Sequence, residues 1–321
     1  MAERIEERST AGTSSEGRQV TPLGLANLFI VYLVWGSTYL AIRVAVRPGA
    51  GIPPFTLGFG RMTLAGVLLL ALAALKSDLR RPSLRELGVL VASGLLLWTV
   101  ANGMVAWAEQ RVDSSLAALM IATIPLWTVV FESLLDRRRP SGRLVLFLLL
   151  GFAGAAMLSA PSWRSGERAD LLSMVALVLA PVSWSLGSIL QSRVPVRMPT
   201  LASAGYQQLA GGLGFAVVVI LVGEPAPTPA LEAWLAWGYL VLFGSLLGFS
   251  AYVYVLQSLP ISIAMTYAYV NPAIAVILGA LLLNESLSTS TLLGAALVLA
   301  SVAGVFHLRS RRARLRKPGI A

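Results

Sequence analysis

Long apolar blocks separated by short polar connections run through most of the sequence. A helix that rises ~1.5 Å per residue needs about 20 mostly apolar residues to cross ~30 Å of hydrocarbon. Ten blocks of that size follow one another, at roughly residues 23–46, 55–75, 84–108, 114–135, 143–160, 171–190, 201–222, 231–256, 262–283 and 291–308. The pattern predicts an all-α integral membrane protein with ten transmembrane helices.

The distribution of charge agrees with a membrane protein and predicts its orientation. Only 12% of the residues are charged and the mean hydropathy is +0.76, whereas about 25% of residues are charged in an average soluble domain. If the N-terminus is cytoplasmic, 19 of the 25 Lys and Arg residues fall in cytoplasmic segments and four in the opposite loops. Because membrane proteins concentrate positive charge in cytoplasmic loops, we expect both termini in the cytoplasm of a bacterial-type cell.

The polar ends and the missing cysteines narrow the possible partners. Residues 1–22 lack the apolar core of a signal peptide, so they are expected to form a disordered cytoplasmic arm, and residues 309–321 a basic cytoplasmic tail. The net charge of +10 places cations beside anionic lipid headgroups, which favours the lipid bilayer and not nucleic acid as the partner. The absence of cysteine excludes disulfides and cysteine-ligated zinc.

Two halves of the chain resemble each other. A shift of 147 residues superposes Pro125 on Pro272, and with small gaps Trp35 meets Trp184. Because each half holds five spans, an odd number, the second half begins on the opposite side of the membrane from the first. The sequence therefore predicts inverted repeats, the arrangement that many secondary transporters place around a midplane site. The predicted repeats are residues 23–160 and residues 161–308.

Four short motifs follow one another along the spans. They are Tyr-Leu-Val-Trp-Gly-Ser-Thr-Tyr at 32–39, the segment 54–66, Ala-Leu-Met-Ile-Ala-Thr-Ile-Pro at 118–125 and Leu-Leu-Leu-Asn-Glu-Ser-Leu at 281–287. In this order, and with the duplicated plan, they resemble the EamA family of the drug/metabolite transporter superfamily over about residues 23–307. The resemblance implies ten helices in inverted repeats and export or exchange of small metabolites such as amino acids.

The end of the fourth span departs from that family. Its usual acidic residue is replaced by the run from Asp136 to Arg139, whereas Glu285 keeps it in the second half. The resemblance therefore assigns no shared role to this carboxylate. Glu132 lies near the same end of the span, and we expect it to form an ion pair with the arginines of the run.

Aromatic and polar residues form matching stripes on the first and sixth spans. Trp35, Tyr39 and Arg43 lie at i, i+4 and i+8, so they share one helix face. Trp184 and Ser188 have the same spacing in the second half. Polar groups in hydrocarbon need partners or a water-filled cavity, so paired stripes indicate a solute pathway. The alternative is that the Trp residues pack in the core or anchor at the membrane interface.

Further polar candidates lie on the third, eighth and ninth spans. Asn102 is near mid-membrane and has several hydrogen-bonding sites to satisfy, and Tyr252 occupies the corresponding face in the second half. Tyr267 and Asn271 are one helical turn apart. The predicted substrate-binding residues are Trp35, Tyr39, Asn102, Trp184, Ser188, Tyr252, Tyr267 and Asn271.

Proline interrupts the fourth and ninth spans at equivalent positions. A proline leaves the carbonyl group four residues earlier without its helical partner, which here means Ile121 before Pro125 and Ala268 before Pro272. We predict that the two prolines are hinges. The alternative is a pair of static kinks whose free carbonyls are satisfied by neighbouring Ser or Thr side chains.

Three charged residues of the spans are candidates for charge pairing or coupling. Arg43 and Arg61 are the only cations inside predicted spans, and Glu109 lies near an outer end. A guanidinium group binds a carboxylate with two parallel hydrogen bonds, so either arginine is suited to a carboxylate-bearing solute. Either could equally snorkel to the headgroups, and for Arg61 we expect pairing with Glu109 or Asp113.

These observations predict a secondary transporter that exports or exchanges small polar metabolites, such as amino acids or related compounds, by alternating access. Multidrug efflux of lipophilic cations is the alternative that the aromatic stripes allow. A polytopic membrane enzyme is disfavoured, because the single histidine and scattered acids form no catalytic cluster. Without such a cluster or a phosphate-binding loop, we expect no metal and no cofactor. Protons as the coupling ion, and the oligomeric state, stay open.

Overall fold

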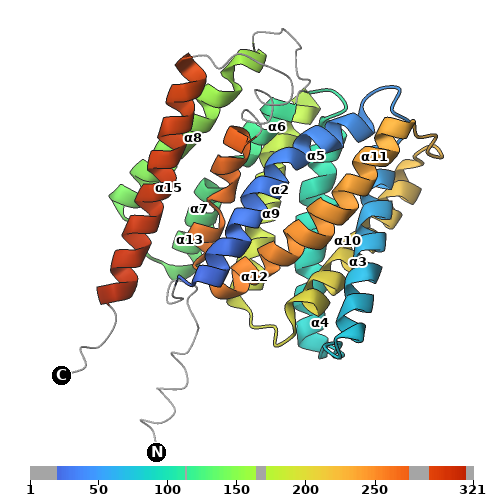
Figure 1. The fold of residues 1–321 in the computed structure, drawn as a ribbon, viewed down its shortest axis with the longest axis horizontal. Coiled ribbons are helices and arrows are strands. Elements are labelled where there is room, and N and C mark those ends of the chain that lie inside the picture. Colours follow the sequence, from blue (N-terminus) through green and yellow to red (C-terminus); the bar gives the residue numbers. More distant parts are fainter. Residues whose placement is uncertain (1–19, 113, 164–170, 275–288, 316–321) are drawn as a thin grey trace, which may run out of the picture.

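The computed structural model describes residues 20–112, 114–163, 171–274 and 289–315, and these form a bundle of helices (Figure 1). The helices are α2 (Pro22–Val46), α3 (Pro54–Leu75), α4 (Leu84–Gly94), the π-helix η2 (Leu95–Asn102), α5 (Gly103–Ala108), α6 (Ser114–Ile121), α7 (Ile124–Asp136), α8 (Gly142–Trp163), α9 (Leu171–Arg193), α10 (Thr200–Val222), α11 (Leu231–Tyr239), the π-helix η3 (Leu240–Phe249), α12 (Ser250–Ser258), α13 (Ile261–Ala264) and α15 (Thr289–Leu315). A further helical segment covers residues 267–274.

The predicted apolar blocks coincide with these helices. Seven helical stretches of the described chain are long and apolar enough to cross a membrane. Two shorter apolar stretches, Gly142–Met157 and Leu292–Leu308, match the fifth and tenth predicted spans. The described residues contain no β-strand. The protein is therefore an all-α integral membrane protein, as predicted.

Several predicted features fall outside the described residues. They are residues 1–19 of the arm, Asp113, the part of the ninth span after residue 274 with Glu285, and residues 316–321 of the tail. At the C-terminal end α15 continues to Leu315, past the predicted end of the span at residue 308. Arg, Ala and Leu all favour helix, so the helix continues where the apolar block has ended.

The halves of the chain are interleaved. α2 packs against α11, η3 and α12 of the second half, and reciprocally α9 packs against α4, η2 and α5 of the first half. Equivalent spans also pair, α3 with α10 and α8 with α15, at opposite edges of the bundle (Figure 1). The largest cluster of buried apolar side chains draws on both halves. The residues on either side of the predicted boundary near residue 160 therefore do not pack as two separate units.

Two predicted spans are broken helices. α6 ends at Ile121 and α7 begins at Ile124, with Pro125 in the first turn of α7, where its missing N–H costs no hydrogen bond. In the ninth span α13 ends at Ala264 and helix resumes at residue 267, so this break precedes Pro272 by more than one turn. The breaks therefore lie at different distances from the two prolines, and the hinge role of both prolines stays a prediction.

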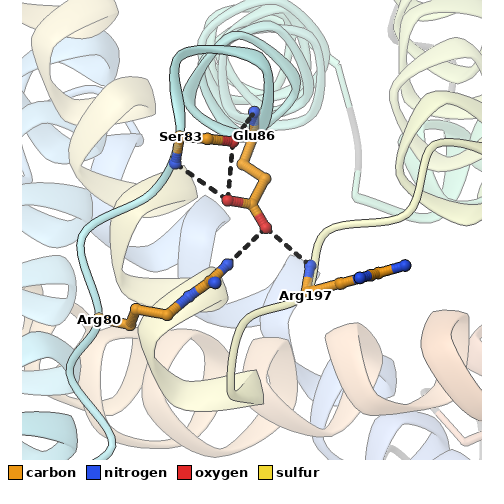
Figure 2. A network of polar contacts seen from close by, with 4 residues as sticks. All are labelled: Arg80, Ser83, Glu86 and Arg197. Carbon is orange, nitrogen blue, oxygen red and sulfur yellow. Dashed lines mark hydrogen bonds and ion pairs between the residues drawn. The ribbon is translucent and has the colours of Figure 1, made fainter.

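Carboxylates from one half bind backbone N–H groups of the other half at both ends of the bundle. Glu86, in the first turn of α4, accepts hydrogen bonds from the backbone N–H and hydroxyl of Ser83, both at 2.9 Å (Figure 2). It also accepts from the backbone N–H of Arg197 at 3.0 Å and from the Arg80 guanidinium at 2.6 Å (Figure 2). Arg197 belongs to the loop before α10, so Glu86 ties the start of α4 to the second half.

At the opposite end of the bundle, a carboxylate of the second half binds the first half. Glu224, just after α10, accepts the backbone N–H groups of Phe55 and Thr56 at 3.0 and 2.7 Å and the Thr56 hydroxyl at 2.8 Å. It thereby satisfies free N–H groups in the first turn of α3 and places a negative charge at the positive end of the helix dipole. The paired helices α3 and α10 are thus fastened near both ends.

Glycine permits the close approach of α4 to α10. A Cβ atom at Gly94 would lie 2.3 Å from the carbonyl oxygen of Gln207. Because that oxygen belongs to the backbone of α10, it cannot turn away as a side chain would. The contact therefore requires glycine at this position, where the two helices meet backbone to backbone.

We expect Gly94→Ala to lower the free energy of unfolding by about 1–3 kcal/mol, the usual cost of overpacking, because α4 and α10 must separate. Thermal unfolding of the purified protein in detergent measures this effect. Gly88→Ala is the matched control in the same helix, since a Cβ there meets no atom within 4 Å. Equal melting temperatures for the two variants would contradict the backbone contact.

Candidate functional site

Aromatic side chains from several helices meet near the middle of the bundle. The ring centroid of Trp35, on α2, lies 5.4 Å from that of Trp184 on α9. It lies 4.9 Å from that of Tyr252 on α12 and 5.1 Å from that of Tyr267. Trp98, on η2, lies 5.8 Å from Trp184. We call these five residues the aromatic cluster, and it joins rings from both halves of the chain.

Hydrogen bonds fix the orientation of three of these five rings. The Trp35 indole N–H donates to the carbonyl oxygen of Gly244 at 3.1 Å. The Trp184 indole N–H donates to the Tyr252 hydroxyl at 3.1 Å, and that hydroxyl lies 2.6 Å from the Ser188 hydroxyl. Buried Trp and Tyr need such partners for their polar atoms, and once paired they hold their faces in place. The rings of Trp35, Trp184 and Tyr252 are therefore held in fixed orientations.

A cavity lies against the aromatic cluster. Its empty space is about 480 Å³, including the open space at its mouth. Five of the eight predicted substrate-binding residues line it, namely Trp35, Tyr39, Asn102, Trp184 and Tyr267. The rest of the lining consists of three isoleucines, a valine, an alanine and Trp98, together with Thr38 and Arg61. The lining is thus mainly apolar, with a few polar groups of the kind that orient a ligand.

The other three predicted residues lie behind the cavity wall. Ser188 and Tyr252 hold Trp184 through the hydrogen bonds described above. Asn271 is 1% exposed and lies beside the Tyr39 hydroxyl. Neither atom of its amide group makes a well-aligned hydrogen bond within the described part of the chain. Within the described residues, Asn271 therefore has free hydrogen-bonding capacity beside Tyr39, which lines the cavity.

Arg61, on α3, places a buried guanidinium group in the cavity wall. Its side chain is 3% exposed, and its Nε–H donates to the Ser245 hydroxyl at 2.8 Å. Its guanidinium carbon lies 5.2 Å from the centroid of the Trp98 ring, a cation–π distance. Among the described residues no carboxylate forms an ion pair with it. The predicted pairing of Arg61 with Glu109 is not what the structure shows.

Glu109 faces Arg43 instead. Arg43 donates to the backbone carbonyl of Glu109 and to that of Val112, the second at 3.1 Å. The Glu109 carboxylate is fully buried, feels the charge of Arg43, and accepts no hydrogen bond from the described residues. Arg43 and Glu109 thus lie together, one helical turn from Val105 of the cavity lining.

The ion pair at the end of α7 also differs from the sequence-based expectation. Glu132 was expected to pair with the arginines at 137–139, but its partner in the structure is Arg193, 3.8 Å away at the end of α9. Arg193 also binds both carboxylate oxygens of Asp136, at 2.6 and 2.9 Å. α7 ends at Asp136, and the next residue, Arg137, has a left-handed backbone conformation, so the chain turns away from the helix at the arginines 137–139. The pairing therefore joins the two halves.

The π-helices η2 and η3 are features that the sequence did not reveal. Moved by the 147-residue repeat shift, η2 falls on residues 242–249, inside η3. η2 supplies Trp98 and Asn102 to the cavity, while η3 supplies the Gly244 carbonyl and Ser245 hydroxyl that hold Trp35 and Arg61. π-helical turns are rare and occur often at functional sites. Composition does not mark them as π-helices, because an apolar segment of this kind can equally form an α-helix.

A bundle of membrane-spanning helices around a cavity lined by aromatic and polar side chains fits the class of membrane transport proteins. The model of the EamA-like transporter family matches residues 22–160 and 171–307. The chain therefore belongs to the EamA-like transporter family, and the resemblance drawn from its motifs is confirmed.

Related proteins carry transporter names. The chain is 37% identical over 273 residues to the uncharacterized inner membrane transporter YedA of Escherichia coli (strain K12), which covers 84% of this chain and 86% of that protein. It is 25% identical over 275 residues to the probable terminal-alkyne amino-acid exporter of Streptantibioticus cattleyicolor, covering 86% of this chain and 90% of that protein. A solved crystal structure shares the fold with a TM-score of 0.73 at 24% identity, over 90% of this chain and 98% of that one.

Proposed function

We propose that this protein is a secondary transporter that exports or exchanges small polar metabolites, with amino acids or related compounds as its solutes. The observation that carries the proposal is the cavity, which is lined by aromatic rings from both halves and by the polar groups of Thr38, Tyr39 and Asn102. Apolar walls with a few polar groups are typical of small-molecule sites. The name of the Streptantibioticus relative, a probable amino-acid exporter, points to the same solute class.

Alternating access between two inverted five-helix repeats is the mechanism that we propose. The reciprocal packing of α2 and α9 and the matching positions of η2 and η3 support two structurally equivalent halves. Transporters of this kind expose a midplane site by rocking one repeat against the other. The broken fourth and ninth spans, with Pro125 and Pro272, are our candidates for the segments that bend.

We further propose a bacterial inner membrane location with both termini in the cytoplasm. The excess of Lys and Arg in the segments on the N-terminal side supports this orientation. The name of YedA as an inner membrane transporter supports the location. Because the chain has no cysteine, single cysteines near each terminus can be labelled with membrane-impermeant reagents to test it.

Efflux of lipophilic cations is the second candidate function. The aromatic cluster favours it, because ring faces attract cations. The charge of Arg61 in the same cavity opposes it, since two cations in a medium of low polarity repel each other. Amino-acid-like solutes are therefore the better proposal.

Counterflow in proteoliposomes tests the function and the coupling together. The panel contains the proteinogenic amino acids, related carboxylic acids and tetraphenylphosphonium, each measured with and without a pH gradient. Accumulation of an amino acid supports the proposal, and acceleration by the gradient adds protons as the coupling ion. Transport of tetraphenylphosphonium alone would replace it with cation efflux, and no transport of any solute in the panel would count against a transporter of small metabolites.

We expect Asn271→Ala to lower the rate of counterflow about three- to tenfold, because the buried amide supplies a hydrogen bond worth ~0.5–1.5 kcal/mol to the solute or to Tyr39. Asn102→Ala, in the cavity lining, is expected to act alike. Asn27→Ala is the control, since Asn27 bonds only to the exposed Leu23 carbonyl one turn earlier. Normal rates in both test variants, with normal membrane expression, would remove the two amides from the site.

A further inference from the structure

Arg61 is a cation in the hydrophobic interior for which the described residues supply no counter-ion. Its side chain is 3% exposed, and the neighbouring acid, Glu109, lies next to Arg43 and not next to Arg61. A charged side chain in the middle of a membrane is costly unless it pairs with an opposite charge or faces water. The Trp98 face compensates part of that charge. Within the described part of the chain, no side chain supplies a full counter-charge, and the cavity that Arg61 lines is open to a ligand that does.

We propose that Arg61 binds the carboxylate of the solute, so that this protein selects small monocarboxylates over their neutral or cationic analogues. The inference rests on the proposed function, because it takes the cavity as the place where the solute binds. One guanidinium group balances one negative charge, and the remaining lining is apolar or uncharged. Dianions such as phosphate monoesters would keep an unbalanced charge there.

The contacts of Arg61 leave its two terminal nitrogens available to bind a ligand. Ser245 accepts the Nε–H at 2.8 Å, and within the described residues the two terminal nitrogens, Nη1 and Nη2, make no hydrogen bond. The planar guanidinium group offers parallel N–H bonds to both oxygens of a carboxylate from this edge. Ser245 thus orients the group, and Arg61 lines the cavity with both terminal nitrogens available for a ligand.

The rest of the lining offers contacts to the rest of such a solute. Trp35, Trp184 and Tyr267 offer aromatic rings to an apolar or aromatic side chain. The hydroxyl of Tyr39 and the amide of Asn102 remain to accept hydrogen bonds from the ammonium group of an amino acid, or to bond the hydroxyl or carbonyl oxygen of a hydroxy or keto acid. Amino acids with apolar side chains combine these features, and so do the corresponding hydroxy and keto acids.

Gly244 is a specificity-determining position in this arrangement. A Cβ atom there would lie 2.9 Å from Nη2 of Arg61 and 3.2 Å from Cγ2 of Thr38. Gly244→Ala therefore displaces the guanidinium head while leaving its charge in place. Gly238→Ala, in the preceding helix α11, is the matched control, because a Cβ there meets no atom within 4 Å.

The test measures binding to the purified full-length protein in detergent, separately from transport. The probes are leucine and phenylalanine, their amides, the amines isoamylamine and phenethylamine, and inorganic phosphate and chloride. We expect the amino acids to bind at least about tenfold more tightly than their amides and amines, the usual size of a lost charged hydrogen bond. Phosphate and chloride are expected to compete weakly.

Variants assign that preference to Arg61. Arg61→Gln should reduce the affinity for leucine and phenylalanine to that of their amides, and Arg61→Lys should restore part of it. Gly244→Ala and Ser245→Ala keep the charge but disturb its position, so they should weaken carboxylate binding about three- to tenfold with little change for the amides. These two variants also decide the matter if Arg61→Gln fails to fold.

Each outcome bears on the proposal. Equal binding of acids and amides by the wild-type protein, or an unchanged acid preference in Gly244→Ala and Ser245→Ala, would overturn it, as would no binding of either amino acid. Acid-selective binding that depends on Arg61 but is never accompanied by counterflow would leave this inference standing and remove the transporter. Rapid counterflow of the amides would overturn this inference and leave the proposal of a transporter standing.

Discussion

Trp35→Ala is expected to weaken the apparent affinity for the transported solute in counterflow by roughly ten- to thirtyfold, as loss of a central aromatic contact usually does. Trp35 lines the cavity and touches Trp184, Tyr252 and Tyr267 at centroid distances of 5.4, 4.9 and 5.1 Å. Its removal takes away a binding surface and loosens the rings around it. The apparent affinity is read from the dependence of the initial counterflow rate on solute concentration.

Two further variants separate binding from packing. Trp35→Phe keeps most of the ring contacts but loses the hydrogen bond to Gly244, so it should fall between the wild-type protein and Trp35→Ala. Trp234→Ala removes a Trp that is 53% exposed and packs against Trp237, and it should leave the affinity unchanged. An unchanged affinity in Trp35→Ala, with a lower melting temperature, would assign Trp35 to packing alone.

The largest effect on stability is expected for Arg193→Gln. This variant leaves Glu132 and Asp136 without their shared cation where the ends of α7 and α9 meet. Breaking a buried pair costs about 3–5 kcal/mol, and because these side chains are 8–28% exposed we expect a smaller loss, roughly 2–3 kcal/mol. Thermal unfolding in detergent measures the loss.

An exposed ion pair provides the control. Arg47 and Glu232 are joined at the other end of the bundle with side chains 45% and 54% exposed, so Arg47→Gln should cost less than about 1 kcal/mol. The double variant Arg193→Gln with Asp136→Asn should recover part of the stability, because it removes one uncompensated carboxylate. If Arg193→Gln were no more destabilising than Arg47→Gln, the pair would not fasten the two halves.

The interleaved packing gives these predictions a common basis. α2 and α9 each carry a Trp of the aromatic cluster and each pack into the other half of the chain. The hydrogen bonds of Glu86 and Glu224 and the ion pair of Arg193 also connect the two halves. A movement of one half against the other would therefore change the cavity and these polar contacts together.

Much of the site followed from local spacing. Trp35 and Tyr39 are four residues apart, so predicting a helix there also predicted that they share one face of it. Both line the cavity. Trp184 and Tyr267 were identified by the repeat and by helical spacing, and they join the same wall. Their role in binding a solute stays a prediction.

Other contacts were beyond the reach of sequence. The partners of Arg61, Glu109 and Glu132 depend on which helices become neighbours, and several combinations of charge satisfied the sequence equally well. Sequence proximity favoured the arginines at 137–139 for Glu132, but Arg193 on α9 is the residue that packing brings near. The matching π-helices η2 and η3 follow from packing too, because widening of a helix leaves no mark in composition.

The sequence by itself determined the membrane class, the positions of most helices and the family. The physical reason is that hydrocarbon accepts only long apolar segments with internally satisfied backbones, a constraint that acts on each segment separately. Only the tertiary structure decided which helices meet, where the cavity lies and that Arg61 has Ser245 and Trp98 as its neighbours. Those choices depend on side-chain fit between helices far apart in sequence, such as the backbone contact at Gly94, which no single segment encodes.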